Sequence, residues 1–433
     1  MADSRSQANF NFPDFQIGND IGTEIQSATL LTTKNFKVSV VRDNQKVPGI
    51  LEVTPTNEAL ISWKDLDLEH HIELNRIQRL CESLLIDTFH SRADEFKADD
   101  EHKILINAYA RELRNADGIN QFKLRIYPRY ANGQRIVFSQ GSETPTILES
   151  DSPIPAGTTV LKDPAPGKPF EYTNPVKPNL EVYSAIVSSL RNNLPKFKNI
   201  DNSKLENDQR QNHDKCFNCK HPQKHVDQAG LMQVAIKVEG QLYEFNLALD
   251  ARDQTHAGRG YIIPNNHVSS LRHSPDLSIG LLHKIGDCYQ RAAEAFFNSE
   301  AEHPRTYDRA VLMNLYKAEE GGPHVHLHMV PRSPSNGYSM EYPMLAKDYI
   351  PLINDAAAKK RIVDNFALKL ANEISKEPAF KNMEITFPYL SYKHGMEVTS
   401  AQHGAALLTP KNGAGDSKTK EEQPTVTHVT KLD

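Results

Sequence analysis

The sequence predicts an α+β fold in which an antiparallel sheet packs against helices. Apolar and polar residues alternate with the two-residue period of a strand in segments such as 36–43 and 231–250. In residues 67–89 and 278–297 apolar residues recur instead at helical spacing. The pair Asn132-Gly133 favours the tight turn of a hairpin, and strands joined by such turns pair antiparallel.

The first half of the chain is expected to mix strands and helices. The expected elements are strands at 36–43 and 49–55, helices at 67–89 and 102–116, and a hairpin of strands 122–130 and 134–140. Prolines crowd residues 142–179, where they remove backbone donors and fix the chain. We therefore expect an irregular connector there, with edge strands at most, and then a short helix at 181–194.

The second half carries the clearer pattern. Its expected elements are a hairpin at 231–250, a strand at 260–268, a helix at 278–297, strands at 309–316 and 324–331, a helix at 355–376 and a strand at 383–390. We find no internal sequence repeat. The expected domains are an unassigned α+β N-terminal domain (1–140), a proline-rich connector with a short helix (141–213), a C-terminal domain (214–398) and a disordered tail (399–433).

Composition limits the class of protein. The formal net charge of the 433 residues is -5, so no overall basic field attracts nucleic acid. The four cysteines include the close pair Cys216 and Cys219, which favours metal or redox chemistry in a reducing compartment over a disulfide scaffold. We see neither a secretory leader nor an apolar run of about 18 residues. We therefore expect a cytoplasmic protein without membrane contact, although a protein exported without such a leader would share these features.

Three histidines stand at every second position of GGPHVHLHMVPR, residues 321–332. In a strand His324, His326 and His328 project to one face, and the intervening apolar residues project to the other, toward the core. Three imidazoles this close cannot all be charged comfortably, so we expect an anion or a metal over them. Two chemistries fit: a catalytic zinc held by the three rings, or a neutral imidazole that attacks a phosphate.

The wider sequence resembles the histidine triad superfamily of nucleotide hydrolases and transferases. HVHLHMV matches its His-φ-His-φ-His-φ-φ motif (φ apolar) at every position, and IIPNNH ends at His267 like its Ile-Pro-x-x-His element. Asp250 and Asn314 are weaker matches to its acidic residue and its asparagine. The resemblance covers about residues 214–335 and implies a C-terminal histidine-triad-like domain with an antiparallel sheet and packed helices.

The resemblance also implies a structural zinc. Zinc-bearing members hold the metal with a Cys-x-x-Cys, the histidine of Ile-Pro-x-x-His and the first triad histidine, which correspond to the ligands Cys216, Cys219, His267 and His324. Four protein ligands leave no position for water, so such a site stabilises the fold and takes no part in catalysis. His221 and His225 are rival ligands, and two buried or redox-active thiols are the alternative interpretation of the cysteine pair.

The resemblance assigns further roles. It makes His326 the nucleophile that forms a covalent nucleotidyl-histidine, and His328 a donor to the phosphate oxygens. The expected nucleotide-binding residues are Asp250 at the ribose, Asn314 near the phosphate or ribose, and Gly321 and Gly322, whose backbone N–H groups approach the phosphate. For Asp250 and Asn314 a surface position without function is the alternative.

The branch within the superfamily stays open. A histidine at 328, where many transferases have glutamine, favours hydrolysis, and Pro331-Arg332 resembles the dinucleoside polyphosphate hydrolases. Pro323 resembles the uridylyltransferases instead. We expect a nucleotide hydrolase or nucleotidyltransferase that cleaves an α-phosphate linkage, with hydrolysis favoured. The alternatives are a metal-dependent hydrolase with zinc on the triad, and a catalytically silent protein that binds a nucleotide or a partner.

The expected partner is a nucleotide or dinucleotide substrate, with a homodimer as a further expectation. Basic and aromatic residues interleave in FKLRIYPRY, residues 122–130. Single-stranded nucleic-acid surfaces have this pattern, but so does any amphipathic hairpin. We favour the hairpin, so nucleic acid is the less favoured partner.

Overall fold

A computed structural model confirms the predicted α+β class. It describes residues 12–19, 27–42, 49–60, 62–89, 105–114, 120–129, 135–139, 146–148, 158–162, 180–198, 228–250, 258–266, 275–298, 306–313, 324–332, 355–391, 396–398 and 408–410. Within these residues the α-helices are α1 (Leu68–Phe89), α2 (Leu180–Asn193), α3 (Asp276–Phe297) and α4 (Ala356–Ser375). Short 3-10 turns precede α1 (η1, Trp63–Asp65) and follow α2 and α4 (η3, Leu194–Phe197; η9, Pro378–Phe380).

Twelve of the described strands form one sheet, and every recorded pairing in it is antiparallel. In spatial order the strands are β1 (Gln16–Ile17), β2 (Ser27–Thr32), β3 (Phe36–Val41), β4 (Leu51–Pro55), β6 (Asn120–Arg129), β5 (Leu105–Arg114), β13 (Thr306–Met313), β14 (Val325–Arg332), β12 (Gly260–Pro264), β11 (Gln241–Asp250), β10 (Gln228–Val238) and β15 (Glu384–Leu390). Two small sheets lie apart, namely β7 (Arg135–Ser139) with β8 (Thr146–Leu148) and β9 (Thr158–Lys162), and β16 (Met396–Val398) with β17 (Leu408–Pro410).

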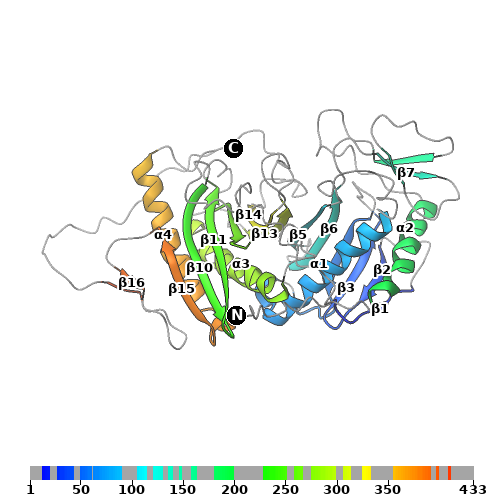
Figure 1. Cartoon of the computed structure of the whole chain (residues 1–433). Coiled ribbons are helices and arrows are strands. Elements are labelled where there is room, and N and C mark those ends of the chain that lie inside the picture. Colours follow the sequence, from blue (N-terminus) through cyan, green and yellow to red (C-terminus); the bar gives the residue numbers. More distant parts are fainter. Residues whose placement is uncertain are drawn as a thin grey trace, which may run out of the picture.

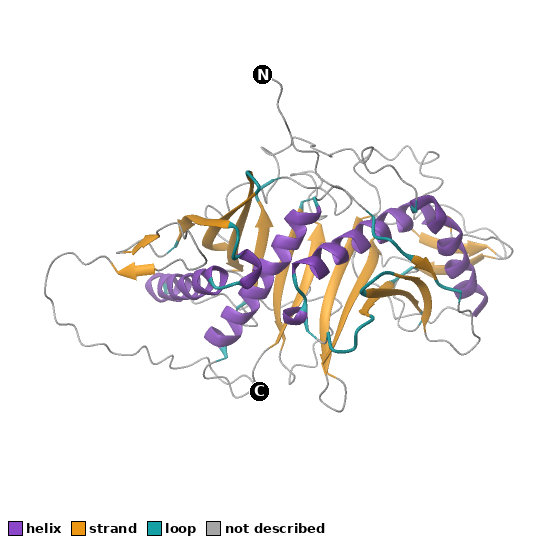
Figure 2. Cartoon of the chain, turned by 90° about the horizontal axis from the view of Figure 1, so that it is seen from below, coloured by secondary structure: helices purple, strands orange, loops and turns teal. Residues whose placement is uncertain are grey.

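The helices α1 and α3 cross one face of the large sheet (Figures 1 and 2). The apolar side chains of the central strands join the helices in one buried cluster, which includes Leu124 of β6, Leu327 of β14, Leu84 of α1 and Leu282 of α3. Burial of this apolar surface is the main favourable term in folding. The opposite face of the sheet therefore carries the polar positions of the same strands.

The large sheet consists of two halves with the same topology. The N-terminal half is β2, β3, β4, α1, β5 and β6, and the C-terminal half is β10, β11, β12, α3, β13 and β14. The spatial order of the strands in one half is the mirror image of the order in the other, and β5 pairs with β13 at the centre. The fold therefore contains a structural repeat that the sequence does not reveal.

The pairing registers show that the two halves also share a local irregularity. Both outer hairpins have the same irregularity, between Thr29 and Leu31 in β2 and between Gly230 and Met232 in β10. The extra residue is Leu30 in one half and Leu231 in the other, and the carbonyl of each accepts a backbone hydrogen bond from the neighbouring edge segment, at 3.0 Å and 2.9 Å. A bulge changes the twist of a strand, so this shared bulge gives both halves the same local shape.

The registers also equate single residues of the two halves. β4 aligns Glu52 with Arg125 of β6, and β12 aligns Tyr261 with His328 of β14. Tyr109 of β5 and Ala310 of β13 are the partners of these two β6 and β14 residues, and they pair with each other. The resulting equivalent pairs are Ile50 and Arg259, Leu51 and Gly260, Glu52 and Tyr261, Lys123 and His326, and Arg125 and His328.

The two halves also meet where α1 crosses α3. A Cβ built on Gly280 of α3 would lie 2.9 Å from a side-chain carbon of Ile72 of α1, so glycine permits the close approach. Buried charges accompany this apolar contact. Asp276 of α3 forms ion pairs with Arg76 and Arg79 of α1, both at 2.8 Å.

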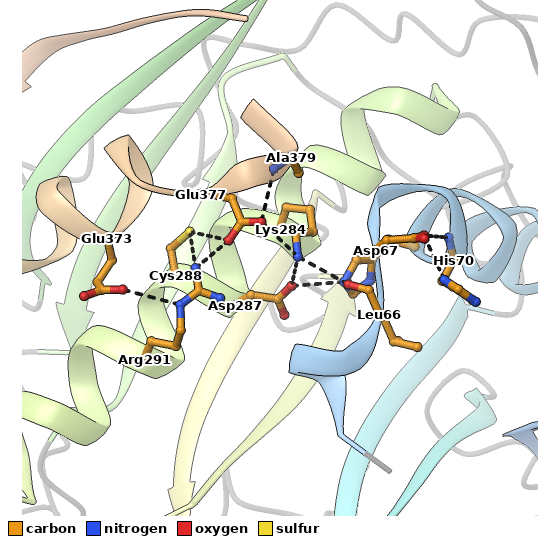
Figure 3. Close-up of polar contacts among 11 residues, drawn as sticks. Leu66, Asp67, His70, Lys284, Asp287, Cys288, Arg291, Glu373, Glu377 and Ala379 are labelled. Atoms are coloured by element: carbon orange, nitrogen blue, oxygen red, sulfur yellow. Dashed lines mark hydrogen bonds and ion pairs between the residues drawn. The ribbon is translucent and has the colours of Figure 1, made fainter. Parts of the chain in front are cut away.

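A second ionic network ties the crossing to the C-terminal segment. Lys284 of α3 contacts Asp287 at 2.8 Å, Glu377 at 3.3 Å and the carbonyl oxygen of Leu66 at 3.3 Å (Figure 3). Burial alone would lower the pKa of Lys284, but the two carboxylates raise it above its ordinary value. The lysine is therefore charged, and buried pairs of this kind are costly to break.

Two predicted elements of the first half are wrong. Residues 102–116 were expected to form a helix, but 105–114 form strand β5, which pairs with β6 and β13. The expected hairpin of 122–130 with 134–140 is also absent, because β6 pairs with β4 and β5 while β7 pairs with β8 and β9. β5 and β6 pair with each other, and the more distant strands β13 and β4 pair with their outer edges, so these pairings override the local pattern.

Several other expected elements agree with the structure. The helices at 181–194, 278–297 and 355–376 and the hairpin at 231–250 are confirmed. The expected edge strands of the connector correspond to β8 and β9. Among the helices that the structure describes, none is long and apolar enough to cross a membrane. The domain boundaries stay a prediction.

Candidate active site

Strand β14 carries His326 and His328 of the triad (His324, His326 and His328), and His324 directly precedes it. The intervening Val325, Leu327 and Met329 are fully buried in the cluster that contains the apolar residues of α3. The three histidines therefore occupy the face opposite the helices. They are buried as well, with exposed fractions of 0%, 7% and 2% along the triad.

A hydrogen bond defines the neutral form of His326. Its Nδ1 lies 2.8 Å from the carbonyl oxygen of His324. A carbonyl oxygen only accepts, so Nδ1 carries the hydrogen and donates it. In the neutral ring the lone pair is consequently on Nε2.

His328 is a neutral ring. Burial first, and then the charges of His326 and Arg259, lower the pKa of His328 well below its ordinary value. Its ring lies 4.6 Å from the ring of His326 and 4.5 Å from the ring of Tyr261, measured between centroids. Neither ring nitrogen has a hydrogen-bond partner among the residues that the structure describes. A buried polar group of this kind is costly unless a ligand satisfies it.

Arg259 is a site residue that the sequence analysis missed. It directly precedes β12, two positions before Tyr261, and is buried. Its position close to His328 brings a permanent positive charge to the triad. The sequence offered one signal, an arginine between two glycines immediately before an apolar strand.

Helix α3 holds the backbone on which Arg259 stands. The hydroxyl of Tyr289 donates to the carbonyl oxygen of Gly258 at 2.9 Å. Gly258 has φ +93°, a conformation that favours glycine. A Cβ at Gly260 would lie 2.3 Å from that hydroxyl and 2.6 Å from the carbonyl oxygen of Ala248, so only glycine fits here. The segment 258–260 is therefore fixed on both sides of the arginine.

The hydrogen bond of the His324 ring is the one expected of a zinc ligand. Its Nε2 lies 3.0 Å from the carbonyl oxygen of Pro264, so Nε2 carries the hydrogen and Nδ1 is the nitrogen that can bind a metal. A histidine that binds a metal usually donates its other N–H to a carbonyl in this way. Pro264 precedes the other expected histidine ligand, His267, by three residues in the sequence.

The other predicted site residues cannot be placed. Cys216, Cys219, His267, Asn314, Gly321 and Gly322 lie outside the described residues, and so do the rival ligands His221 and His225. Asp250 ends β11 and pairs with Gln228, but its side chain is not among those described. Within the described part of the chain, no group of three or more histidine, cysteine or acidic side chains is arranged to hold a metal.

The interleaved aromatic and basic residues of β6 are a strand with two different faces. Phe122 is fully buried and packs edge-on against Trp63, with ring centroids 4.8 Å apart. Its ring is therefore unavailable for stacking on a nucleic-acid base. Lys123 and Arg125 lie on the other face.

Comparisons with known proteins return only distant structural similarity. No protein-family model matches the chain, and no curated protein matches it. A uridylyltransferase mutant is 9% identical with a TM-score of 0.32, and the match covers 79% of this chain and 80% of that chain. A galt-like protein from Arabidopsis thaliana is 10% identical with a TM-score of 0.33 (77% and 82% covered). An ADP-glucose phosphorylase from Arabidopsis thaliana with bound ADP-glucose is 10% identical with a TM-score of 0.32 (69% and 71%). Similarity this low does not assign the chain to a family.

Proposed function

We propose that this protein is a nucleotide hydrolase or nucleotidyltransferase of the histidine triad type, in which His326 forms a covalent nucleotidyl intermediate. The observation that carries the proposal is the hydrogen bond from Nδ1 of His326 to the carbonyl of His324. It orients the ring and leaves the lone pair of the neutral imidazole on Nε2. The sequence resemblance to the superfamily at the triad supports the same assignment.

The reaction takes two displacements at phosphorus. Nε2 of His326 attacks the α-phosphorus, the N–P bond forms, and the leaving group departs with the electron pair of its P–O bond. The ring then carries a positive charge, which the carbonyl of His324 stabilises through the Nδ1 hydrogen. Water attacks the phosphorus next, the N–P electrons return to Nε2, and the proton of the water passes to solvent.

The neighbours of His326 suit the charge that develops on the phosphate. His328 is neutral and keeps one N–H, which can donate to a non-bridging oxygen. Arg259 contributes a fixed positive charge to the same place. A bound phosphate would thus satisfy the buried ring of His328, which has no other hydrogen-bond partner among the described residues.

Hydrolysis is the favoured direction, because histidine stands at position 328 where many transferases of the superfamily have glutamine. The substrate class is a nucleotide or dinucleotide, with Asp250, Asn314, Gly321 and Gly322 as proposed binding residues. A homodimer stays a prediction.

The zinc that we propose is structural. His324 would bind it through Nδ1, together with Cys216, Cys219 and His267, and the metal would stabilise the fold. A catalytic zinc on the triad is the less favoured alternative, because the three triad histidines, all among the described residues, are not grouped in a way that could hold a metal. Metal analysis of the purified protein tests the site, with one zinc per chain expected and loss of thermal stability after chelation.

The test of function is turnover of three substrate classes: dinucleoside polyphosphates, adenylyl phosphoramidates and nucleoside-diphosphate sugars. We expect wild type to release a nucleotide from at least one class and His326→Ala to release none. His70→Ala, which removes a histidine outside the site, is the matched control and should retain activity.

Other outcomes decide between the alternatives. Product that forms only with an added acceptor would make the protein a transferase. Immediate loss of turnover on chelation, with the fold intact, would favour catalytic zinc. Tight nucleotide binding without turnover in any class would favour the catalytically silent protein and contradict the proposal.

A further inference from the structure

The N-terminal half has its own polar cluster at the position of the triad. We call Glu52, Lys123 and Arg125 the basic cluster. Its two cations stand two residues apart on β6, on the face opposite the buried Phe122 and Leu124. The registers make Lys123 equivalent to His326 and Arg125 equivalent to His328. The segments FKLRIYPR (122–129) and VHLHMVPR (325–332) share leucine, proline and arginine at matching places.

The cluster is held in place by its carboxylate. Glu52 on β4 receives an ion pair from Lys123 at 3.0 Å and another from Arg125 at 3.0 Å. One carboxylate oxygen serves each cation, so both long side chains are oriented before any ligand arrives. The three side chains together carry one net positive charge.

The two cations of the cluster are also more accessible than their equivalents. The side chains of Lys123 and Arg125 are 22% and 20% exposed, whereas His326 and His328 are almost fully buried. Part of each side chain is therefore open to solvent, from which an anion would approach. Guanidinium and ammonium groups held side by side are the usual protein partners of phosphate oxygens.

The cluster is too far from the triad to share one phosphate with it. Three strand spacings separate Arg125 from His328 along the row through Tyr109 and Ala310. At about 4.8 Å per spacing, this is roughly 14 Å. The basic cluster and the triad are therefore separate places on one face of the sheet.

We propose that the basic cluster is a second anion site, which binds a phosphate group without transferring it. Lys123 and Arg125 are both held as donors by the carboxylate of Glu52, at 3.0 Å each, an arrangement that suits binding of phosphate oxygens. The inference rests on the proposed phosphate chemistry of the triad for the choice of ligand. Its test does not depend on turnover.

The experiment is calorimetric titration of the full chain with inorganic pyrophosphate in a His326→Ala, His328→Ala background. We expect binding to persist there. Adding Lys123→Gln and Arg125→Gln should weaken it at least tenfold. Adding Glu52→Gln instead should strengthen it several-fold, because the substitution removes the competing carboxylate charge. Lys237→Gln, which removes a lysine from an exposed pair with Glu384, is the matched control and should leave the affinity unchanged.

A purely structural ion-pair cluster gives a different result. In that case pyrophosphate affinity is the same in all four backgrounds, and Glu52→Gln only lowers the melting temperature, which would overturn the proposal. Hydrogen exchange provides a second readout in the unsubstituted chain. Pyrophosphate should slow exchange in the peptide over 120–129, and unchanged exchange there would also contradict the site.

Titration with ADP identifies the source of the phosphate. Equal affinities for ADP and pyrophosphate indicate a site for free phosphates, and tighter binding of ADP indicates a nucleotide site. If the proposed function fails, turnover is absent but this binding remains. If the second site fails, turnover remains while binding does not respond to changes at Lys123, Arg125 or Glu52.

Discussion

The two halves of the large sheet share their strand order, their outer bulge and the register of their central strands. The polar residues on the equivalent strands β6 and β14 differ. In the C-terminal half β14 presents neutral or titratable rings at 326 and 328, enclosed beside Arg259. In the N-terminal half β6 presents Lys123 and Arg125, paired with Glu52 and partly open to solvent. Under the two proposals, one backbone arrangement supports two sites, and the residue type decides between attack on phosphorus and binding of a phosphate.

The largest expected effect is on turnover, which the account assigns to the C-terminal half alone. His326→Ala should lower turnover by about 10⁴-fold or more, because it removes the nitrogen that forms the covalent intermediate. Steady-state rates at saturating substrate measure this loss. His326→Lys, which copies the residue of the N-terminal half, should be equally inactive because its amine is protonated. Activity retained in His326→Lys would break the comparison.

The next effect tests how the halves are joined. Lys284→Met leaves the buried Asp287 and Glu377 without their shared cation, so we expect unfolding to become easier by about 3–5 kcal/mol. Denaturant unfolding monitored by circular dichroism gives the value. Lys237→Met, in an exposed pair, should change little. Equal effects of the two substitutions would mean that the network in Figure 3 does not stabilise the crossing.

An equivalent pair of core positions sharpens the comparison. Leu51→Ala creates a cavity in the N-terminal half and should cost about 2–5 kcal/mol of stability. Gly260→Ala adds a methyl group at the equivalent place, against the Tyr289 hydroxyl and the Ala248 carbonyl, and should cost about 1–3 kcal/mol. The same unfolding assay measures both. A neutral Gly260→Ala would show that Tyr289 does not fix the segment that bears Arg259.

The smallest effect concerns pH. The folded protein keeps His328 neutral, because its pKa is well below the ordinary value of 6.5 that applies in the unfolded chain. Below about pH 6.5 the unfolded chain therefore binds a proton that the folded chain does not, and stability falls as pH decreases. We expect a contribution of up to roughly 1.4 kcal/mol per pH unit, which His328→Gln should remove. Identical slopes in the two proteins between pH 5 and 7 would contradict the lowered pKa.

The fold and the site could be predicted where the signal is local. The alternation in HVHLHMV predicted a strand with its apolar residues in the core, and strand β14 with buried Val325, Leu327 and Met329 confirms this. The helical spacing in 278–297 likewise corresponds to α3. These patterns are set by the geometry of one element, so a single sequence contains them.

The remainder depends on contacts between distant segments. Residues 105–114 form a strand only because β6 and β13 supply its hydrogen-bond partners, and β13 lies about 200 residues further along the chain. The structural repeat escaped the sequence because equivalent positions differ in kind, as Gly260 and Leu51 do. Arg259 lies close to the triad only because β12 pairs with β14, and local sequence does not specify this pairing.

The most direct test of the account is the mass of the protein caught during turnover. Wild type is mixed briefly with an intact dinucleotide or nucleotide sugar that it hydrolyses. The mixture is quenched in alkaline denaturant, because the bond between imidazole nitrogen and phosphorus is acid-labile. The account predicts one nucleotidyl group per chain, attached at His326 in the peptide that contains the triad. Turnover without any adduct, or an adduct on a residue other than His326, would contradict it.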